Sequence, residues 1–165
     1  MEDLDFLNEY REDNRIEAKR AQGGLPHSLW ETYSSFANTL GGVILLGVAE
    51  ADNADKSLYS VPLFDPKELV DEFWDLVNDR LVVSANILKP EDVQIFNSDG
   101  NPVVAIFVPR AEFRDRPVYI GTDPYTGTFY RKGEGDYRCP RHEVEAMLQD
   151  QSDPTPLDGI RGIKT

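Results

Sequence analysis

The chain has 165 residues, of which 40% are hydrophobic and 28% are charged, and this composition supports one globular domain of ordinary size. One cysteine, Cys139, and two histidines, His27 and His142, exclude an internal disulfide and argue against a cysteine-rich or histidine-rich metal site. No run of about 18 apolar residues occurs and the first residues are acidic, so the sequence predicts a cytoplasmic chain without a membrane span or secretory signal.

The charge is unevenly distributed along the chain. A net charge of −13 argues against loose, non-specific attraction to nucleic acid, whose affinity comes largely from cations that displace counterions. Residues 48–100 hold 12 acidic and 4 basic side chains, whereas residues 110–141 hold 7 basic and 5 acidic ones. A locally basic surface on an acidic body is therefore predicted.

The first half of the chain alternates between strand and helix patterns. Residues 1–13 have the spacing of a short helix, and residues 14–20 alternate as in a strand whose charged side chains form the outer face. Ser28 and Glu31 have capping-box spacing, which predicts a helix that ends at Gly41 or Gly42. The following residues, 43–48, are apolar on both faces and predict a central buried strand.

The second half begins with a further helix signal, in which Asp65 is the cap and Pro66 opens the first turn. Its predicted buried stripe consists of Leu69, Phe73, Leu76, Val77 and Leu81. A hairpin is predicted over 93–108 around a turn at 97–101, and a second one pairs 117–120 with 128–132. A final helix opens at Pro140.

These elements predict a single layered α/β domain, α+β in character, with a mixed sheet, two β-hairpins and about three helices. We expect residues 1–150 to form the domain. Residues 151–165, rich in proline, glycine and polar side chains, are interpreted as a linker to a further C-terminal domain.

Three acidic residues, Glu12, Glu17 and Glu50, with Asp52 beside the last, are candidate ligands for a divalent metal. Magnesium and manganese need several carboxylate oxygens, so converging acids would suit them. On spacing alone, solvated acids on an acidic protein are the favoured interpretation. Lys19, two residues after Glu17, would either neutralise a phosphate or pair with that glutamate at the surface.

Aromatic and cationic side chains interleave over residues 129–138, and glycines follow them. Such a strand end can stack bases and hold phosphates, although an ordinary strand with a glycine turn fits the same pattern. Gly41 and Gly42 follow a helix and lack the lysine of a P-loop, so nothing indicates nucleotide hydrolysis. No grouping of serine, histidine and acid is visible, which argues against a triad hydrolase.

Taken together, these motifs resemble the Schlafen AlbA domain family, a divergent AlbA-like nucleic-acid-binding domain of bacterial regulators and of the Schlafen core. The likeness covers about residues 9–149, roughly one domain in length. It rests on four segments: Glu12-x4-Glu17-Ala18-Lys19, the block from Ser35 to Glu50 with Phe36-Ala37-Asn38-Thr39-Leu40-Gly41-Gly42 at its centre, Arg116-Pro117-Val118-Tyr119, and Thr128 to Gly133. Ala18 stands where the family commonly has phenylalanine, and Ala49 where an acid is frequent.

The resemblance implies a DNA- or RNA-binding regulatory domain, the N-terminal part of a longer protein similar to transcriptional regulators, that forms a homodimer. The residues expected to contact nucleic acid are Lys19, Arg116, Tyr130, Arg131, Lys132 and Arg138, with Tyr137 also available for stacking.

Two alternatives stay open. The first, implied by the ribonuclease-active Schlafens, is a magnesium- or manganese-dependent ribonuclease in which Glu12, Glu17, Lys19 and Glu50 are catalytic and Asp52 is a further candidate for the third acid. The second is a dimerisation or protein-interaction domain whose acids are vestigial.

Overall fold

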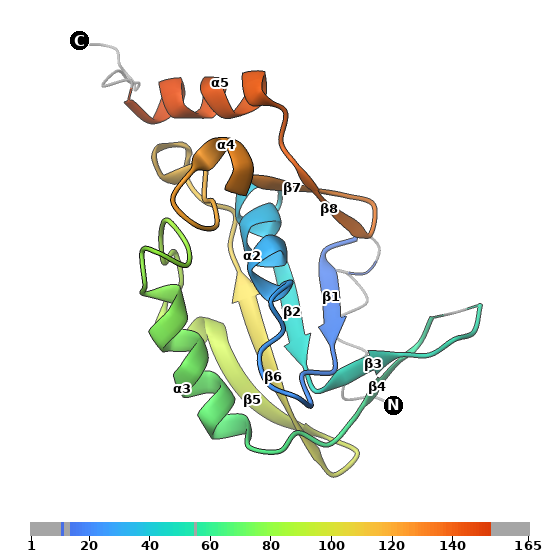
Figure 1. Ribbon diagram of the computed structural model, residues 1–165. Coiled ribbons are helices and arrows are strands. Elements are labelled where there is room, and N and C mark those ends of the chain that lie inside the picture. The colour runs from blue at the N-terminus through green and yellow to red at the C-terminus, as the bar shows by residue number, and fades with distance from the viewer. Residues whose placement is uncertain (1–10, 12–13, 55, 153–165) are drawn as a thin grey trace.

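A four-stranded sheet forms the centre of the molecule in the computed structural model, which describes residues 11, 14–54 and 56–152 (Figure 1). The strand order is β1-β2-β6-β5, with β1 (Ile16–Lys19) parallel to β2 (Gly42–Leu46) and the other neighbours antiparallel. The mixed sheets and the helices beside them confirm the predicted α+β domain. The two edge strands of the main sheet are β1, with four residues, and β5, with six residues.

The remaining elements follow in chain order. The strands are β3 (Val48–Glu50), β4 (Leu58–Ser60), β5 (Val93–Ser98), β6 (Asn101–Val108), β7 (Phe129–Lys132) and β8 (Gly135–Arg138). The helices are α2 (Leu29–Asn38), α3 (Pro66–Val77), α4 (Pro124–Gly127) and α5 (Arg141–Ser152), with single 3-10 turns η2 (Pro90–Asp92) and η3 (Phe113–Asp115). Within the described ranges, no helix is long and apolar enough to cross a membrane.

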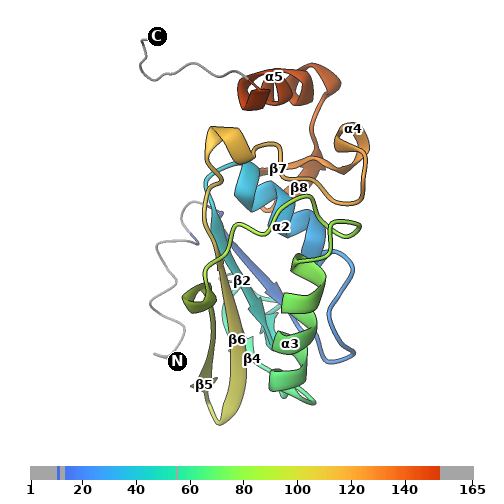
Figure 2. The same cartoon turned by 90° about the vertical axis from the view of Figure 1, so that its left-hand side faces the viewer.

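Helices α2 and α3 cover one face of the sheet, as the edge-on view in Figure 2 shows. Every residue of β2 is buried, which confirms the predicted central strand. Ile44 and Leu46 pack toward the helices, while Val43 and Leu45 belong to a second apolar cluster on the opposite face. Because successive side chains of a strand point to opposite faces, only a strand buried on both sides can be apolar throughout.

Helix α2 begins and ends near the predicted positions, but its cap differs. Ser28 is the N-cap residue, yet its side chain makes no capping hydrogen bond, so the predicted capping box is wrong. The Ser28 hydroxyl instead accepts a hydrogen bond from Lys19 Nζ at 2.9 Å. At the other end, Gly41 has φ +76° and its N–H donates to Phe36 O, so the predicted glycine termination is confirmed.

Helix α3 confirms its predicted start, since the Asp65 carboxylate accepts a hydrogen bond from Glu68 N and Pro66 occupies the first turn. Its predicted buried stripe is correct for Leu69, Phe73 and Val77. Leu81 is 74% exposed, which contradicts its predicted burial. The helix ends at Val77, so residue 81 no longer follows the helical repeat.

The first predicted hairpin is confirmed by β5 and β6, joined by Asp99 and Gly100, both with positive φ. The second predicted hairpin has the wrong partner. Residues 117–120 make only isolated bridges, and β7 pairs with β8 instead. Asp123 caps a helical turn, α4, in the segment that the sequence predicted as a simple hairpin turn.

Tyr33 is fully buried, and its hydroxyl donates to Ala85 O at 2.9 Å and accepts from Ile87 N at 3.1 Å. Burial raises the pKa of Tyr33 well above its usual value, and the hydrogen bond from Ile87 opposes this only in part. We expect Tyr33→Phe to lose about 1–3 kcal/mol of stability, because two backbone groups then lack their partner.

Tyr33 also makes the stability of the domain depend on pH in the alkaline range. The pKa of Tyr33 is higher in the folded than in the unfolded protein. The contribution of this residue to stability is therefore complete below about pH 10 and is lost as the pH rises further. Urea unfolding at pH 7 and pH 10.5 should show a shallower alkaline decline for Tyr33→Phe than for the wild type. Equal declines in both proteins would contradict this assignment.

Candidate nucleic-acid interface and mixed-charge cavity

The β7–β8 hairpin lies against the polar side of α2. Asn38 Nδ2 donates to Val118 O and Phe129 O, and Asn38 Oδ1 accepts from Val118 N at 2.9 Å. Ser34 Oγ donates to Val118 O and accepts from Phe129 N. Side-chain hydrogen bonds from α2, in place of backbone hydrogen bonds between strands, therefore hold the start of β7.

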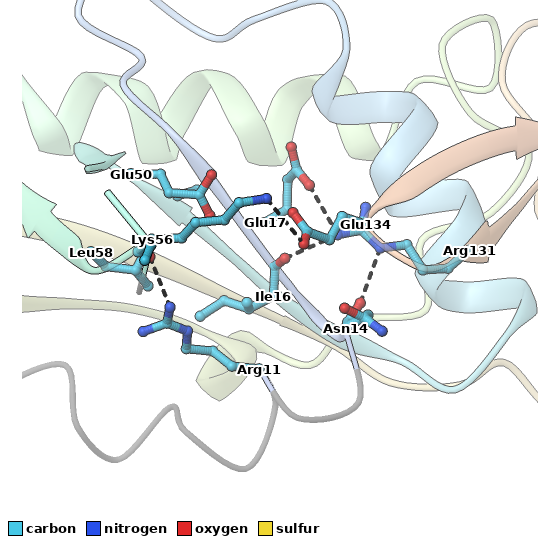
Figure 3. Close-up of a pocket in the computed structure, with 11 residues that line it drawn as sticks. Arg11, Asn14, Ile16, Glu17, Glu50, Lys56, Leu58, Arg131 and Glu134 are labelled. Atoms are coloured by element: carbon cyan, nitrogen blue, oxygen red, sulfur yellow. Dashed lines mark hydrogen bonds and ion pairs between the residues drawn. The ribbon is translucent and has the colours of Figure 1, made fainter. Parts of the chain in front are cut away.

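Arg131 joins this hairpin to the edge strand β1 (Figure 3). Its side chain is 5% exposed. Nε donates to Asn14 O, and Nη2 donates to Ile16 O and contacts Glu17 Oε1, all at 3.0 Å. Nη1 donates to Asp136 Oδ1, so the guanidinium donates three hydrogen bonds and makes an ion pair with Glu17 in addition. The structure thus places the predicted phosphate contact Arg131 inside the domain.

Asp136 of β8 completes this buried network. Its carboxylate accepts hydrogen bonds from the hydroxyls of Thr32 and Ser35 on α2, in addition to the 2.9 Å contact with Arg131 Nη1. The Arg131 guanidinium carbon also lies 4.9 Å from the centre of the Phe36 ring. Residues of β1, β8 and α2 therefore surround the Arg131 guanidinium, which is hydrogen-bonded and lies over an aromatic ring.

The outer face of the hairpin carries Tyr130, Lys132 and Tyr137. Tyr130 and Tyr137 are direct cross-strand partners, with ring centres 6.0 Å apart and planes tilted by 41°. Tyr137 is 52% exposed, and Lys132, which alternates with Arg131, is exposed as well. Arg138 lies on the inner face, where its guanidinium carbon is 6.0 Å from the Phe129 ring centre. The predicted contacts thus divide between two faces.

A cavity of about 320 Å³, which we call the mixed-charge cavity because carboxylates and cations line it in equal number, lies beside β1. Glu17 and Glu50, distant in sequence, both line it, whereas Asp52 is not among its lining residues. Figure 3 shows the two glutamates with Arg131, Lys56 and Glu134 around the same opening. The structure thus brings together two of the predicted acids. Glu12, the third, lies outside the described residues.

The carboxylate oxygens of Glu17 are occupied by cations. Oε1 contacts Arg131 Nη2 at 3.0 Å, and Oε2 contacts Lys19 Nζ at 3.4 Å. Lys19 is only 10% exposed, so the predicted charged outer face of this strand is wrong: it faces α2 and the hairpin. Among the described residues no group of three acids, histidines or cysteines could hold a metal ion. These residues alone do not fit magnesium or manganese.

Arg116 directly follows η3. Burial lowers the pKa of its guanidinium, and the nearby charge of Arg110 lowers the pKa further, while Asp150 of α5 opposes this. Arg116 is half-buried on the connection between β6 and β7, and its predicted contact with nucleic acid stays a prediction.

Cys139 is buried and is not an activated nucleophile. Burial, assisted by the charge of Glu143, raises the pKa of its thiol to about 11. At neutral pH the thiol is therefore protonated and unreactive. This agrees with the absence of a nucleophilic triad in the sequence.

Asp136 and Asn38 position the hairpin, and the sequence prediction missed both. Asp136 lies within the segment 129–138 that the sequence analysis singled out, and the structure places it directly opposite Arg131. No comparable signal marked Asn38, whose partners lie 80 and 91 residues away in the chain. Contacts of that sequence separation become visible only after folding.

Residues 12–140 match the family model described as Schlafen, AlbA_2. The N-terminal domain of a RecG-related protein from Nitrosomonas europaea is 32% identical, with a TM-score of 0.59 over 82% of this chain and 90% of that one. The DIP2311 protein from Corynebacterium diphtheriae shares the fold at 19% identity and a TM-score of 0.53, over 87% of this chain and 25% of that chain. No curated protein matches the sequence.

Proposed function

The chain belongs to the Schlafen AlbA_2 family, and from that premise we propose that it binds unpaired DNA or RNA through the outer face of the β7–β8 hairpin. The observation that carries the proposal is the cross-strand pair of Tyr130, which is half-buried, and Tyr137, which is exposed, with the exposed cation Lys132 beside them. Aromatic side chains of this kind stack bases of any identity, and a neighbouring cation suits the phosphate.

The charge distribution supports a contact surface of limited size. The chain carries a net charge of −13, and Arg131 and Lys19 are engaged with carboxylates inside the domain. Few cations are thus available for phosphates, so base stacking would supply most of the affinity. We expect binding at low ionic strength and only a shallow dependence on salt, since each phosphate contact contributes a slope of about 0.7 on single strands.

Tyr137→Ala tests the proposal. Loss of one stacking ring should weaken binding of a labelled single-stranded oligonucleotide about tenfold, as measured by fluorescence anisotropy in about 50 mM salt. Tyr59→Ala is the matched control, because Tyr59 is also an exposed tyrosine, 43% accessible, but lies on β4. Lys132→Ala should weaken binding less and reduce the salt slope.

Two results would contradict the proposal. One is the absence of binding by the wild type to both single-stranded DNA and RNA. The other is an equal effect of Tyr137→Ala and Tyr59→Ala. Failure to bind any nucleic acid would favour the interaction-domain alternative, and sedimentation of the full chain would then test the predicted homodimer. The regulatory role stays a prediction from the family.

A second candidate, phosphodiester cleavage, is favoured by the presence of Glu17 and Glu50 at one cavity. The informative variant is Glu50→Gln, because Glu17 also holds Arg131 in place and its loss would disturb the fold. If the domain cleaves RNA, Glu50→Gln should abolish cleavage while anisotropy shows unchanged binding. Cleavage at the wild-type rate in this variant would eliminate Glu50 from the chemistry.

A further inference from the structure

A second cleft shares no lining residue with the mixed-charge cavity, and Arg138 of the β7–β8 hairpin lies in its wall. It measures about 610 Å³, within the range of small-ligand sites. Its walls come from the segment before α2, the end of α3 and the α4 loop. The apolar lining residues are Leu25, Pro26, Trp30, Leu76, Leu81, Val82 and Ile120.

An aromatic ring forms part of this lining. One side of Trp30 stacks against Phe73, with ring centres 5.4 Å apart and planes tilted by 4°. Trp30 is 7% exposed, and it lines the cleft. The opening is therefore lined by aromatic and aliphatic carbon, a surface that an aromatic ligand could cover.

Polar groups at the cleft are few and of opposite sign. Arg138 and Glu72 both line it, with the imidazole of His27 also present. Arg138 has no carboxylate partner within 4.0 Å in the described part of the chain, whereas Arg131 has two. On a protein of net charge −13, a cation without such a partner beside an apolar cleft suits an anionic, ring-bearing ligand.

The position of the cleft beside β8 supports a base of the bound strand as its ligand. Arg138 follows Tyr137 on β8, and the two side chains point to opposite faces of the hairpin. We propose that the cleft receives one unpaired nucleobase of the bound strand, with an exocyclic amino group facing Glu72 and a phosphate on Arg138. A carboxylate accepts hydrogen bonds from such amino groups. The proposal rests on nucleic-acid binding by the outer face and deepens it.

The two tryptophans of the chain permit a direct test. Trp74 is not among the residues that line the cleft, so Trp74→Phe leaves Trp30 as the one tryptophan reporter. In this variant, a labelled oligocytidylate should raise anisotropy and quench Trp30 emission with the same midpoint. Oligouridylate, which lacks the amino group, should bind several-fold more weakly. Anisotropy without quenching would overturn the cleft proposal and leave the proposed function standing, whereas no anisotropy change would refute the proposed function itself.

Two exposed threonines supply a matched blocking experiment. Thr126 lines the cleft, whereas Thr122, on the same loop, does not. Thr126→Phe should therefore reduce oligocytidylate affinity about tenfold, and Thr122→Phe should leave it unchanged. Equal affinities of the two variants would overturn the proposal, as would quenching of Trp30 by an apolar dye that oligocytidylate fails to displace.

Discussion

Replacement of Arg131 by methionine is expected to destabilise the domain by about 3 kcal/mol, because removal of one partner of a buried ion pair leaves the other charge uncompensated. Glu17 and Asp136 would both lose a cation, and the Asn14 and Ile16 carbonyl oxygens would lose a donor. Methionine keeps much of the volume over the Phe36 ring, so the loss reports the polar contacts. Urea unfolding followed by circular dichroism measures it.

Lys132→Met is the matched control for this variant. Lys132 is the next residue on β7, but it is exposed and points away from α2, so its substitution should change stability by less than about 0.5 kcal/mol. Combining Arg131→Met with Asp136→Asn should recover part of the loss, because one uncompensated charge is then removed. If the two methionine variants unfold at the same urea concentration, the assigned role of Arg131 is wrong.

The second large effect is expected at Gly42, the first residue of β2. A Cβ atom there would lie 2.7 Å from both Arg15 O and the Phe36 ring, distances that side chains do not tolerate. Gly42→Ala should therefore cost about 3 kcal/mol, at the upper end of the effect of overpacking a core. The backbone oxygen belongs to the β1 side of the sheet, so the strain would separate β1 from β2.

Gly23→Ala provides the comparison. No atom lies within 4 Å of a Cβ at this position, and its φ is not in the left-handed region. Alanine should then be neutral or stabilise by up to about 1 kcal/mol, through the lower entropy of the unfolded chain. Thermal unfolding of both variants decides the matter: a midpoint for Gly42→Ala as high as that of Gly23→Ala would contradict the predicted clash.

Local pattern predicted much of this fold. Asp65 and Pro66 mark the start of α3, and the apolar run at 43–48 marks the central strand, because caps and burial on both faces leave a signature in neighbouring residues. The hairpin partner of β7 was predicted wrongly for the opposite reason. Two segments, 117–120 and 135–138, could each pair with β7, and hydrogen bonds from Asn38 and Ser34 in α2 settle the choice.

The candidate site, like the fold, was predicted from the sequence only in part. The sequence singled out Glu17, Glu50 and Arg131, and the structure brings all three to one cavity. What each side chain does there depends on partners far away in the chain. Arg131 bonds to residues 115 and 117 positions earlier, and no local pattern distinguishes such a structural arginine from one that awaits a phosphate.

The alternation along β7 has a consequence for how such a domain can diversify. Phe129 and Arg131 point inward and are needed for folding, whereas Tyr130 and Lys132 alternate with them on the outer face. Under the proposed function, variation at the outer positions would alter what the hairpin binds while the inner contacts keep the scaffold stable. An engineer could vary these two positions and Tyr137 as a small library, with Arg131 and Asp136 held constant.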